Sequence, residues 1–275
     1  MIAMIMSYEE FVQRLNTTIE TDQSFFDKLL IKIVRDPHRF TGVFRLSNVK
    51  NKLIQYVTQS REIKFGNFME EIITEYIQRM GYRNLEKRIQ ADSQNAQYFN
   101  VDQLFIKDNS IYLIEQKIRD DHDSTKKVGQ FDNFRKKYLL LGKKHPEHEI
   151  IATMWFIDDS LVKNKNYYLG KIANETSANL KLSISYGPEL FINILGNIEA
   201  WNEIYAYLSR NKAERDQESL DIPDFDTSKE IFCALLNLKK ERPALFKKLI
   251  SDDKTYVQLR EELFPTGENL KKLLD

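Results

Sequence analysis

The chain is poor in cysteine, glycine and proline, and each shortage excludes a class of protein. The only cysteine, Cys233, leaves no intramolecular disulfide and no zinc site built from cysteines, which fits a reducing compartment. Nine glycines and six prolines among 275 residues favour long regular elements over a loop-rich or fibrous chain. No apolar run approaches the roughly 18 residues of a membrane helix. The first residues also lack the basic flank of a targeting peptide. We expect a cytoplasmic protein without a membrane partner.

An excess of charge of one sign is also missing, because 41 Lys and Arg balance 41 Asp and Glu. Taken alone, a net charge of zero argues against a polyanionic partner, but contact surfaces are local. Residues 35–64 hold seven basic side chains against two acidic ones, and residues 124–144 hold seven against one. Such stretches can release counterions from phosphates, although a solvated helix face is an equally good interpretation of the second.

The spacing of apolar residues predicts a mixed α/β chain. A period of 3.6 indicates helices over 11–19 and 25–33, a helix with Ser47 as its N-cap, and a further helix from Asn67 to Met80. From residue 82 the period becomes that of strands, with a weak strand over 82–89 and extended runs over 99–106 and 111–114. A helix over 124–142 precedes a strand over 150–157, which is apolar throughout and therefore buried on both faces. A helix over 167–174, a strand over 180–186 and a helix begun by Pro188 follow.

Composition divides the chain into four parts. We expect an N-terminal helical region over 1–64, a core over 65–213, a polar and acidic linker over 214–226, and a C-terminal helical region over 227–275. The C-terminal helices would form either a dimer interface or part of a clamp on a nucleic acid, and the sequence does not choose between these roles.

The two extended runs before residue 115 form a hairpin that carries charged side chains. If Asp108-Asn109 is its two-residue turn, Asp102 lies opposite Glu115, and alternation places Lys117 on the same face. Two facing carboxylates repel unless a cation lies between them, and hard oxygen donors suit Mg²⁺, for which Mn²⁺ can substitute. Two metal-binding carboxylates beside a lysine can hydrolyse a phosphodiester. The alternative is an exposed, salt-bridged hairpin.

This pattern resembles the signature of the PD-(D/E)XK nuclease superfamily. Val101-Asp102, twelve intervening residues and Glu115-Gln116-Lys117 match it, with valine in place of the usual proline. The resemblance implies a restriction-endonuclease-like mixed β-sheet core flanked by helices, with N- and C-terminal helical additions. Families of this kind place a glutamate on the helix before the first core strand. Glu70 is therefore a candidate metal ligand together with Asp102 and Glu115, with Glu71 as the alternative. Gln130, on the helix after the strand, is a further candidate catalytic residue, or a local cap.

The residues after Lys117 resemble those of type II restriction endonucleases, which implies site-specific cleavage of double-stranded DNA. The candidate DNA-binding residues lie in the two basic stretches: Lys126, Lys127, Arg135, Arg39, Arg45 and Lys50. A palindromic site would imply a homodimer, and the resemblance implies a partner methyltransferase. Two alternatives keep the fold: a structure-selective repair or recombination nuclease, and a catalytically silent DNA-binding domain.

Overall fold

The computed structural model describes residues 4–19, 22–42, 44, 46–92, 95–175, 179–215 and 222–274. The chain divides into two compact units: unit 1 comprises residues 1–15 and 65–216, and unit 2 comprises residues 16–64 and 217–275. This grouping differs from the expected one, in which residues 1–64 and 227–275 were separate regions. Residues 16–64 instead pack with the C-terminal helices, and the first fifteen residues belong with the core.

Four helices form the N-terminal part: α1 (Tyr8–Ile19), α2 (Gln23–Arg35), α3 (His38–Thr41) and α4 (Val49–Arg79). The expectation of two helices between Ser47 and Met80 was wrong, because α4 is one helix of 31 residues. Its N-terminal cap is Asn48, whose Oδ1 accepts the N–H of Asn51 at 2.9 Å. Gly66 costs a helix about 1 kcal/mol relative to alanine, which is less than the burial of a neighbour such as Phe68 supplies.

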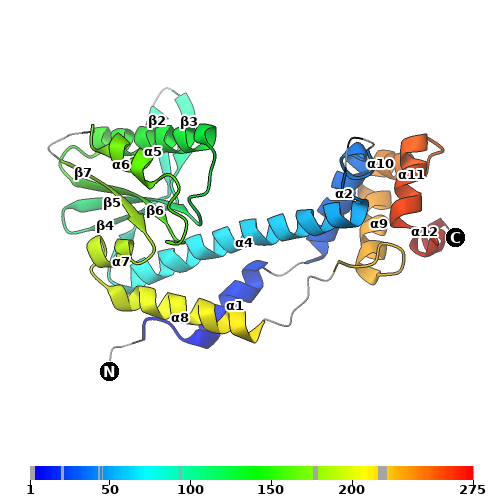
Figure 1. The fold of residues 1–275 in the computed structure, drawn as a ribbon, viewed down its shortest axis with the longest axis horizontal. Helices are drawn as coiled ribbons and strands as arrows, with labels where there is room; N and C mark the ends of the chain where they lie inside the picture. Colours follow the sequence, from blue (N-terminus) through cyan, green and yellow to red (C-terminus); the bar gives the residue numbers. More distant parts are fainter. Residues whose placement is uncertain are drawn as a thin grey trace. The chain divides into compact units, whose positions relative to one another are not determined.

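A five-stranded mixed sheet forms the centre of unit 1 (Figure 1). Its order is β1 (Arg83–Asn84), β4 (Gln103–Lys107), β5 (Ser110–Lys117), β6 (Glu149–Phe156) and β7 (Leu180–Tyr186). β4 is antiparallel to β1 and β5, whereas β5, β6 and β7 are parallel. β2 (Arg88–Asp92) and β3 (Asn95–Asn100) form a separate antiparallel pair. The run expected over 99–106 is therefore not one strand, because Phe99 pairs in the small sheet and Leu104 in the large one.

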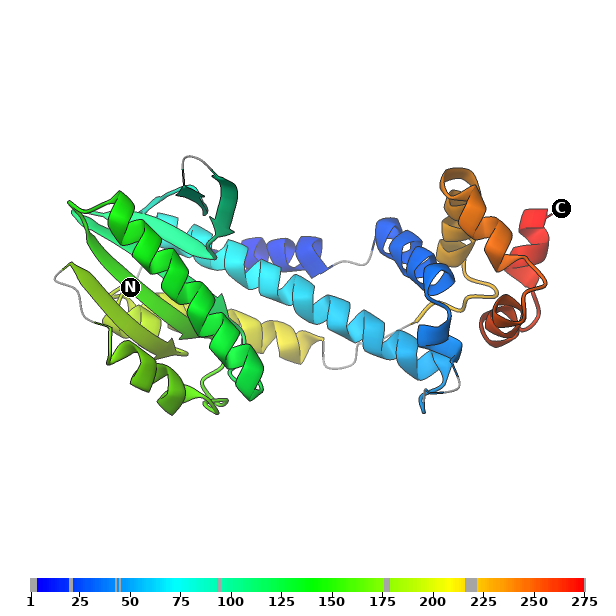
Figure 2. The same ribbon diagram turned by 90° about the horizontal axis from the view of Figure 1, so that it is seen from above.

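Helices cover both faces of the large sheet, as Figure 2 shows for α5 (Ser124–Lys144) on one side and α4 on the other. Side chains alternate along each strand, so Leu113 faces the core under α5 and α6 (Lys165–Ile172). On the opposite face Trp155 packs edge-on against Phe191 of α7 (Glu189–Asn193) and Trp201 of α8 (Ile198–Glu214), with ring centroids 5.9 and 6.0 Å apart. The predicted helix over 124–142 and the predicted strands over 150–157 and 180–186 are confirmed.

Unit 2 is helical and has its own core. It contains α9 (Lys229–Glu241), α10 (Pro243–Leu249), α11 (Lys254–Leu263) and α12 (Glu268–Leu274) in addition to α2, α3 and residues 49–64 of α4. Residues 216–221 of the expected linker lie outside the described residues. Its last two residues, Phe225 and Asp226, are buried in the core of unit 2.

The observed architecture confirms the predicted fold class, a mixed β-sheet core flanked by helices with helical additions at both ends of the chain. Within the described residues, every helix is too short or too polar to cross a bilayer.

Candidate active site

The β4–β5 hairpin places the candidate residues at one end of the sheet. Its register runs from Lys107 opposite Ser110 to Gln103 opposite Ile114, as the turn at Asp108-Asn109 predicts. Asp108 adopts a φ of 52°, a conformation that aspartate tolerates better than most residues. The paired register stops one residue short of Asp102 and Glu115, so these two carboxylates lie just beyond the last ladder pair.

Asp102 accepts a backbone hydrogen bond at the point where the β4–β5 ladder ends. Its Oδ2 accepts the backbone N–H of Gln116 at 2.8 Å, a group that the shorter strand β4 leaves without a backbone partner in this ladder. The same oxygen accepts a hydrogen bond from Lys117 Nζ at 3.2 Å. The Asp102 side chain remains 25% exposed, so it is held in place and still open to a ligand.

Lys117 Nζ lies between the two carboxylates. It donates to Asp102 Oδ2 at 3.2 Å, to Glu115 Oε1 at 2.9 Å and to the carbonyl of Gln116 at 2.9 Å. Burial acts to lower the pKa of Lys117, but the charges of Glu115 and Asp102 and the hydrogen bonds to both outweigh it, so the pKa is raised. Lys117 is therefore an ammonium group at neutral pH, and the structure brings the three predicted residues together.

Lys137 is a fourth member of the cluster. From the sequence it was expected only as one of the basic residues of its helix. It lies on α5, and its Nζ donates to Glu115 Oε2 at 2.5 Å. Both side chains are buried, with 5% and 6% exposed. The spacing of Phe134, Lys137 and Leu141 contained the signal, because positions i, i+3 and i+7 share one helix face. Lys137 thus faces the core and not the solvent.

Glu70 lies on the opposite side of the sheet. Its carboxylate pairs with Lys87 at 3.0 Å, and its backbone carbonyl accepts the side-chain N–H of Gln103 at 2.8 Å. Gln103 also donates to the side chain of Gln116, which points away from Lys117 as alternation predicts. Glu71 is exposed, so Glu70 is the one of the two that faces the sheet.

Gln130 lies on α5, where its side-chain oxygen accepts a hydrogen bond from the hydroxyl of Tyr168 at 3.0 Å.

A buried carboxylate, Asp120, lies between the end of β5 and β7. It accepts hydrogen bonds from the backbone and side-chain N–H groups of Asn164, both at 2.8 Å, and from the hydroxyl of Tyr186, also at 2.8 Å. No role for Asp120 was predicted from its place in the sequence. Its hydrogen bonds hold the segment after Lys117 to β7 and α6 and thereby fix the end of β5.

The donors around Lys117 fit a divalent cation. Carboxylate oxygens from Asp102 and Glu115 already surround one cationic group, the Lys117 ammonium, at 3.2 and 2.9 Å. Oxygen donors are the ligands that Mg²⁺ prefers.

Comparison with known protein families agrees with this geometry. The type II restriction endonuclease family described by HinfI matches residues 8–95 and 82–212, which together take in more than half of the chain. The chain belongs to the HinfI family of type II restriction endonucleases. None of the curated proteins compared with the chain matches it. The HinfI-family match includes α1, the whole of the large sheet and the Asp102, Glu115, Lys117 and Lys137 cluster, and it ends before the last four helices. The predicted relationship to type II restriction endonucleases is confirmed.

The candidate DNA-binding residues of this HinfI-family chain differ in their environment. Lys126 and Lys50 are exposed. Lys127 lies over the ring of Tyr167, 4.7 Å from its centroid. Arg135 pairs with Glu175 at 2.5 Å, so a carboxylate already balances its charge. Arg39 lies 4.0 Å from Asp36, and Arg45 is outside the described residues.

Proposed function

We propose that the chain is a Mg²⁺-dependent, site-specific endonuclease that hydrolyses phosphodiester bonds of double-stranded DNA, with Mn²⁺ able to replace Mg²⁺. The observation that carries the proposal is the convergence of Asp102 Oδ2 and Glu115 Oε1 on Lys117 Nζ at the end of β5. Membership of a family of type II restriction endonucleases supports DNA as the substrate.

In this proposal, Asp102 and Glu115 hold the metal ion. Glu70, which pairs with Lys87 on the opposite side of the sheet, would have to release Lys87 before it served as a further ligand. When bound, the ion would neutralise charge on the phosphate and make a water molecule more acidic. One bond forms between the water oxygen and phosphorus, and one P–O ester bond breaks.

Lys117 assists the attack on phosphorus. It orients or deprotonates the water, or stabilises the negative charge of the pentacovalent phosphorus. Lys137 is a positioning residue, because it binds Glu115 Oε2 and leaves Oε1 directed toward Lys117. Gln130, proposed as an auxiliary catalytic residue, would have to release the Tyr168 hydroxyl before it contacted the substrate.

The DNA backbone is proposed to contact basic side chains of both stretches: Lys126, Lys127, Arg135, Arg39, Arg45 and Lys50. Arg135 contributes less than the others, because Glu175 balances its charge. A homodimer would place two active sites on the two strands of a palindromic site. A methyltransferase of matching specificity would protect host DNA.

Incubation of the purified protein with plasmid DNA and Mg²⁺, followed by sequencing of the ends, tests the function. Discrete fragments with one end sequence support restriction, and no cutting in EDTA supports the metal requirement. A smear, cutting confined to branched DNA, or no cutting at all would contradict the proposal. Sedimentation of the protein with and without a DNA duplex tests the homodimer.

A further inference from the structure

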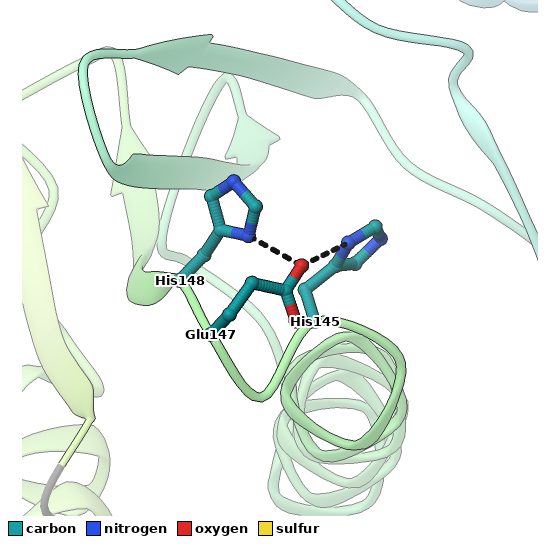
Figure 3. Close-up of side chains that lie close together, drawn as sticks. All are labelled: His145, Glu147 and His148. Atoms are coloured by element: carbon teal, nitrogen blue, oxygen red, sulfur yellow. Dashed lines mark hydrogen bonds and ion pairs between the residues drawn. The ribbon is translucent and has the colours of Figure 1, made fainter.

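A second group of potential metal ligands lies in unit 1, away from the Lys117 cluster. The turn between α5 and β6 presents His145, Glu147 and His148, whose ligand atoms all lie within 4.8 Å of one another. The Glu147 Oε1 atom is 2.7 Å from His148 Nδ1 and 3.8 Å from His145 Nδ1. Figure 3 shows the two imidazole rings on either side of this one carboxylate oxygen.

The His148 ring is within hydrogen-bond distance of Glu147 Oε1, and the His145 ring faces the same oxygen from beyond that distance. In a tetrahedral zinc site with bonds of about 2.0–2.1 Å, neighbouring ligand atoms are about 3.4 Å apart. The distances of 2.7 and 3.8 Å lie on either side of that value. Small side-chain rotations would therefore bring all three ligands onto one ion.

The backbone of the turn is fixed from several directions. His145 ends α5, and its carbonyl accepts the N–H of His148 at 3.1 Å. The side chain of Asn109, in the β4–β5 turn, donates to the carbonyl of Glu147 at 3.2 Å. Pro146 restricts its own φ. The ligands therefore project from a preorganised turn, which reduces the entropy lost when an ion binds.

The neighbouring carboxylate does not belong to this group. Glu149, the first residue of β6, pairs with Lys181 at 2.7 Å and accepts the Ser110 hydroxyl at 3.3 Å. Two imidazole nitrogens and one carboxylate oxygen thus form the donor set. Imidazole nitrogen selects Zn²⁺ and similar transition metals, whereas the all-oxygen set at Asp102 and Glu115 selects Mg²⁺.

The strand register separates this turn from the catalytic cluster. Ser110 pairs with Glu149 at the start of β6, and Lys117 pairs with Phe156 seven residues later. At about 3.3 Å per residue, the two ends are about 23 Å apart. An ion at the turn would be too far away to take part in phosphodiester cleavage.

We propose that His145, Glu147 and His148 form a binding site for a divalent transition metal, with Zn²⁺ as the probe, that links the end of α5 to the start of β6. Water completes the coordination. Because α5 carries Lys137, an ion at this turn stabilises the helix that positions Glu115. The proposal does not depend on the proposed nuclease function.

Calorimetric titration of the chelator-treated protein with ZnCl₂ in excess MgCl₂ tests the site, since Mg²⁺ occupies the oxygen ligands. We expect Zn²⁺ to bind at one site per chain and to raise the unfolding temperature. Loss of an outer-shell partner already weakens metal affinity by about 10–100-fold, so His145→Ala and His148→Ala should each weaken it at least that much. Zn²⁺ uptake by either variant with wild-type affinity, or no uptake by the wild type, would overturn the proposal.

Matched variants separate this site from other effects. His38→Ala removes a histidine of α3 in unit 2, and Asp102→Ala removes a proposed catalytic ligand. Both should bind Zn²⁺ as the wild type does, and loss of binding in Asp102→Ala would assign the ion to the catalytic cluster instead. Co²⁺ provides a second measurement, because its tetrahedral absorption bands should appear in the wild type and vanish in His148→Gln. Retention of those bands in that variant would also overturn the proposal.

Discussion

Asp102 shows how one side chain can serve both fold and chemistry. Its carboxylate accepts the Gln116 N–H where the β4–β5 ladder ends, and the same oxygen contacts the Lys117 ammonium. A structural role and the proposed catalytic role therefore fall on one residue, and a suitable pair of substitutions separates them.

Asp102→Asn keeps a carbonyl oxygen for the Gln116 N–H but removes the negative charge. We expect the unfolding free energy to change little and plasmid cleavage in Mg²⁺ to be lost. Asp102→Ala should also lose cleavage and should unfold about 1 kcal/mol more easily, because a hydrogen bond disappears. Urea unfolding and cleavage assays on both variants measure the two effects, and Mg²⁺-dependent cutting by Asp102→Asn would refute the metal-ligand assignment.

In the proposed function, Lys117 contributes charge at the reacting centre and not the main affinity for DNA. Lys117→Met should therefore lose turnover but bind a cognate duplex in Ca²⁺ about as well as the wild type. A band-shift titration in Ca²⁺ checks this, with Lys163→Met as an exposed control that should keep both properties. Equal loss of binding and turnover in Lys117→Met would contradict a role confined to the chemical step.

Lys137 is the residue whose loss should affect the fold most. Lys137→Met leaves the buried Glu115 with half of its partners, and breaking a buried ion pair costs about 3–5 kcal/mol. The double variant Glu115→Leu, Lys137→Met removes both charges and should recover most of that loss while remaining inactive. Denaturant unfolding of both variants tests this, and equal stability of the single and double variants would be the contrary result.

The sequence predicted three of these four cluster residues and missed the fourth for a physical reason. Alternation along a strand and the hairpin register determine the faces of Asp102, Glu115 and Lys117. The direction of the Lys137 side chain depends on how α5 is rotated about its axis over the sheet. The sequence indicates that rotation only through the spacing of the apolar residues of the helix. A lysine at the edge of such a stripe is interpreted as solvated unless a buried carboxylate is known to lie beneath it.

At the scale of elements, α4 and the β2–β3 pair were the least predictable. Gly66 and the polar residues near it indicated a break, yet Phe68 and Met69 are fully buried and continue the helix. Phe99 and Val101 are compatible with one strand, and only partner strands far along the chain assign Phe99 to β3 and Leu104 to β4. The long apolar strand β6 was predictable because its composition alone requires burial on both faces.

Asp226 connects the segment before α9 to the start of α12, a contact that the sequence did not indicate. Its carboxylate accepts the N–H of Thr266 at 2.6 Å and of Glu268 at 2.9 Å, at the start of α12. Burial acts to raise the pKa of Asp226, but these hydrogen bonds outweigh it, and the pKa lies below its usual value.

The lowered pKa of Asp226 predicts a pH dependence of unit 2. The carboxylate contributes stability that is fully present above its unfolded pKa of about 3.9 and is lost as pH falls through its lower folded pKa. Asp226→Asn should unfold about 1 kcal/mol more easily at neutral pH, and the difference from the wild type should shrink below about pH 4. Unfolding curves across this range measure it. A difference that is constant with pH would contradict the ionised cap.

At the scale of the whole molecule, the chain builds each unit from separated stretches. Residues 16–64 join residues 217–275, and the first fifteen join the sheet. Composition could not predict this grouping, because an acidic stretch indicates a linker without indicating which parts it connects. The balanced total charge likewise gave no information about where the basic residues gather.

DNA binding should therefore depend on local charge. Lys126→Gln removes an exposed cation, and we expect the slope of log affinity against log salt to fall by about one. Arg135→Gln should change the slope less, because Glu175 already balances that arginine. Affinity measurements over a salt series compare the two variants, and a larger effect of Arg135→Gln would reverse the assignment.

The contacts of Glu115 with two lysines have a consequence for the encounter with DNA. Two carboxylates, Asp102 and Glu115, face two ammonium groups, Lys117 and Lys137. The formal net charge of the cluster is therefore zero, like that of the whole chain. Without a cation, the centre therefore carries no excess negative charge. In the proposed function, an approaching phosphate would therefore meet no net repulsion from these four groups, and their charges would not dictate the order in which DNA and Mg²⁺ arrive.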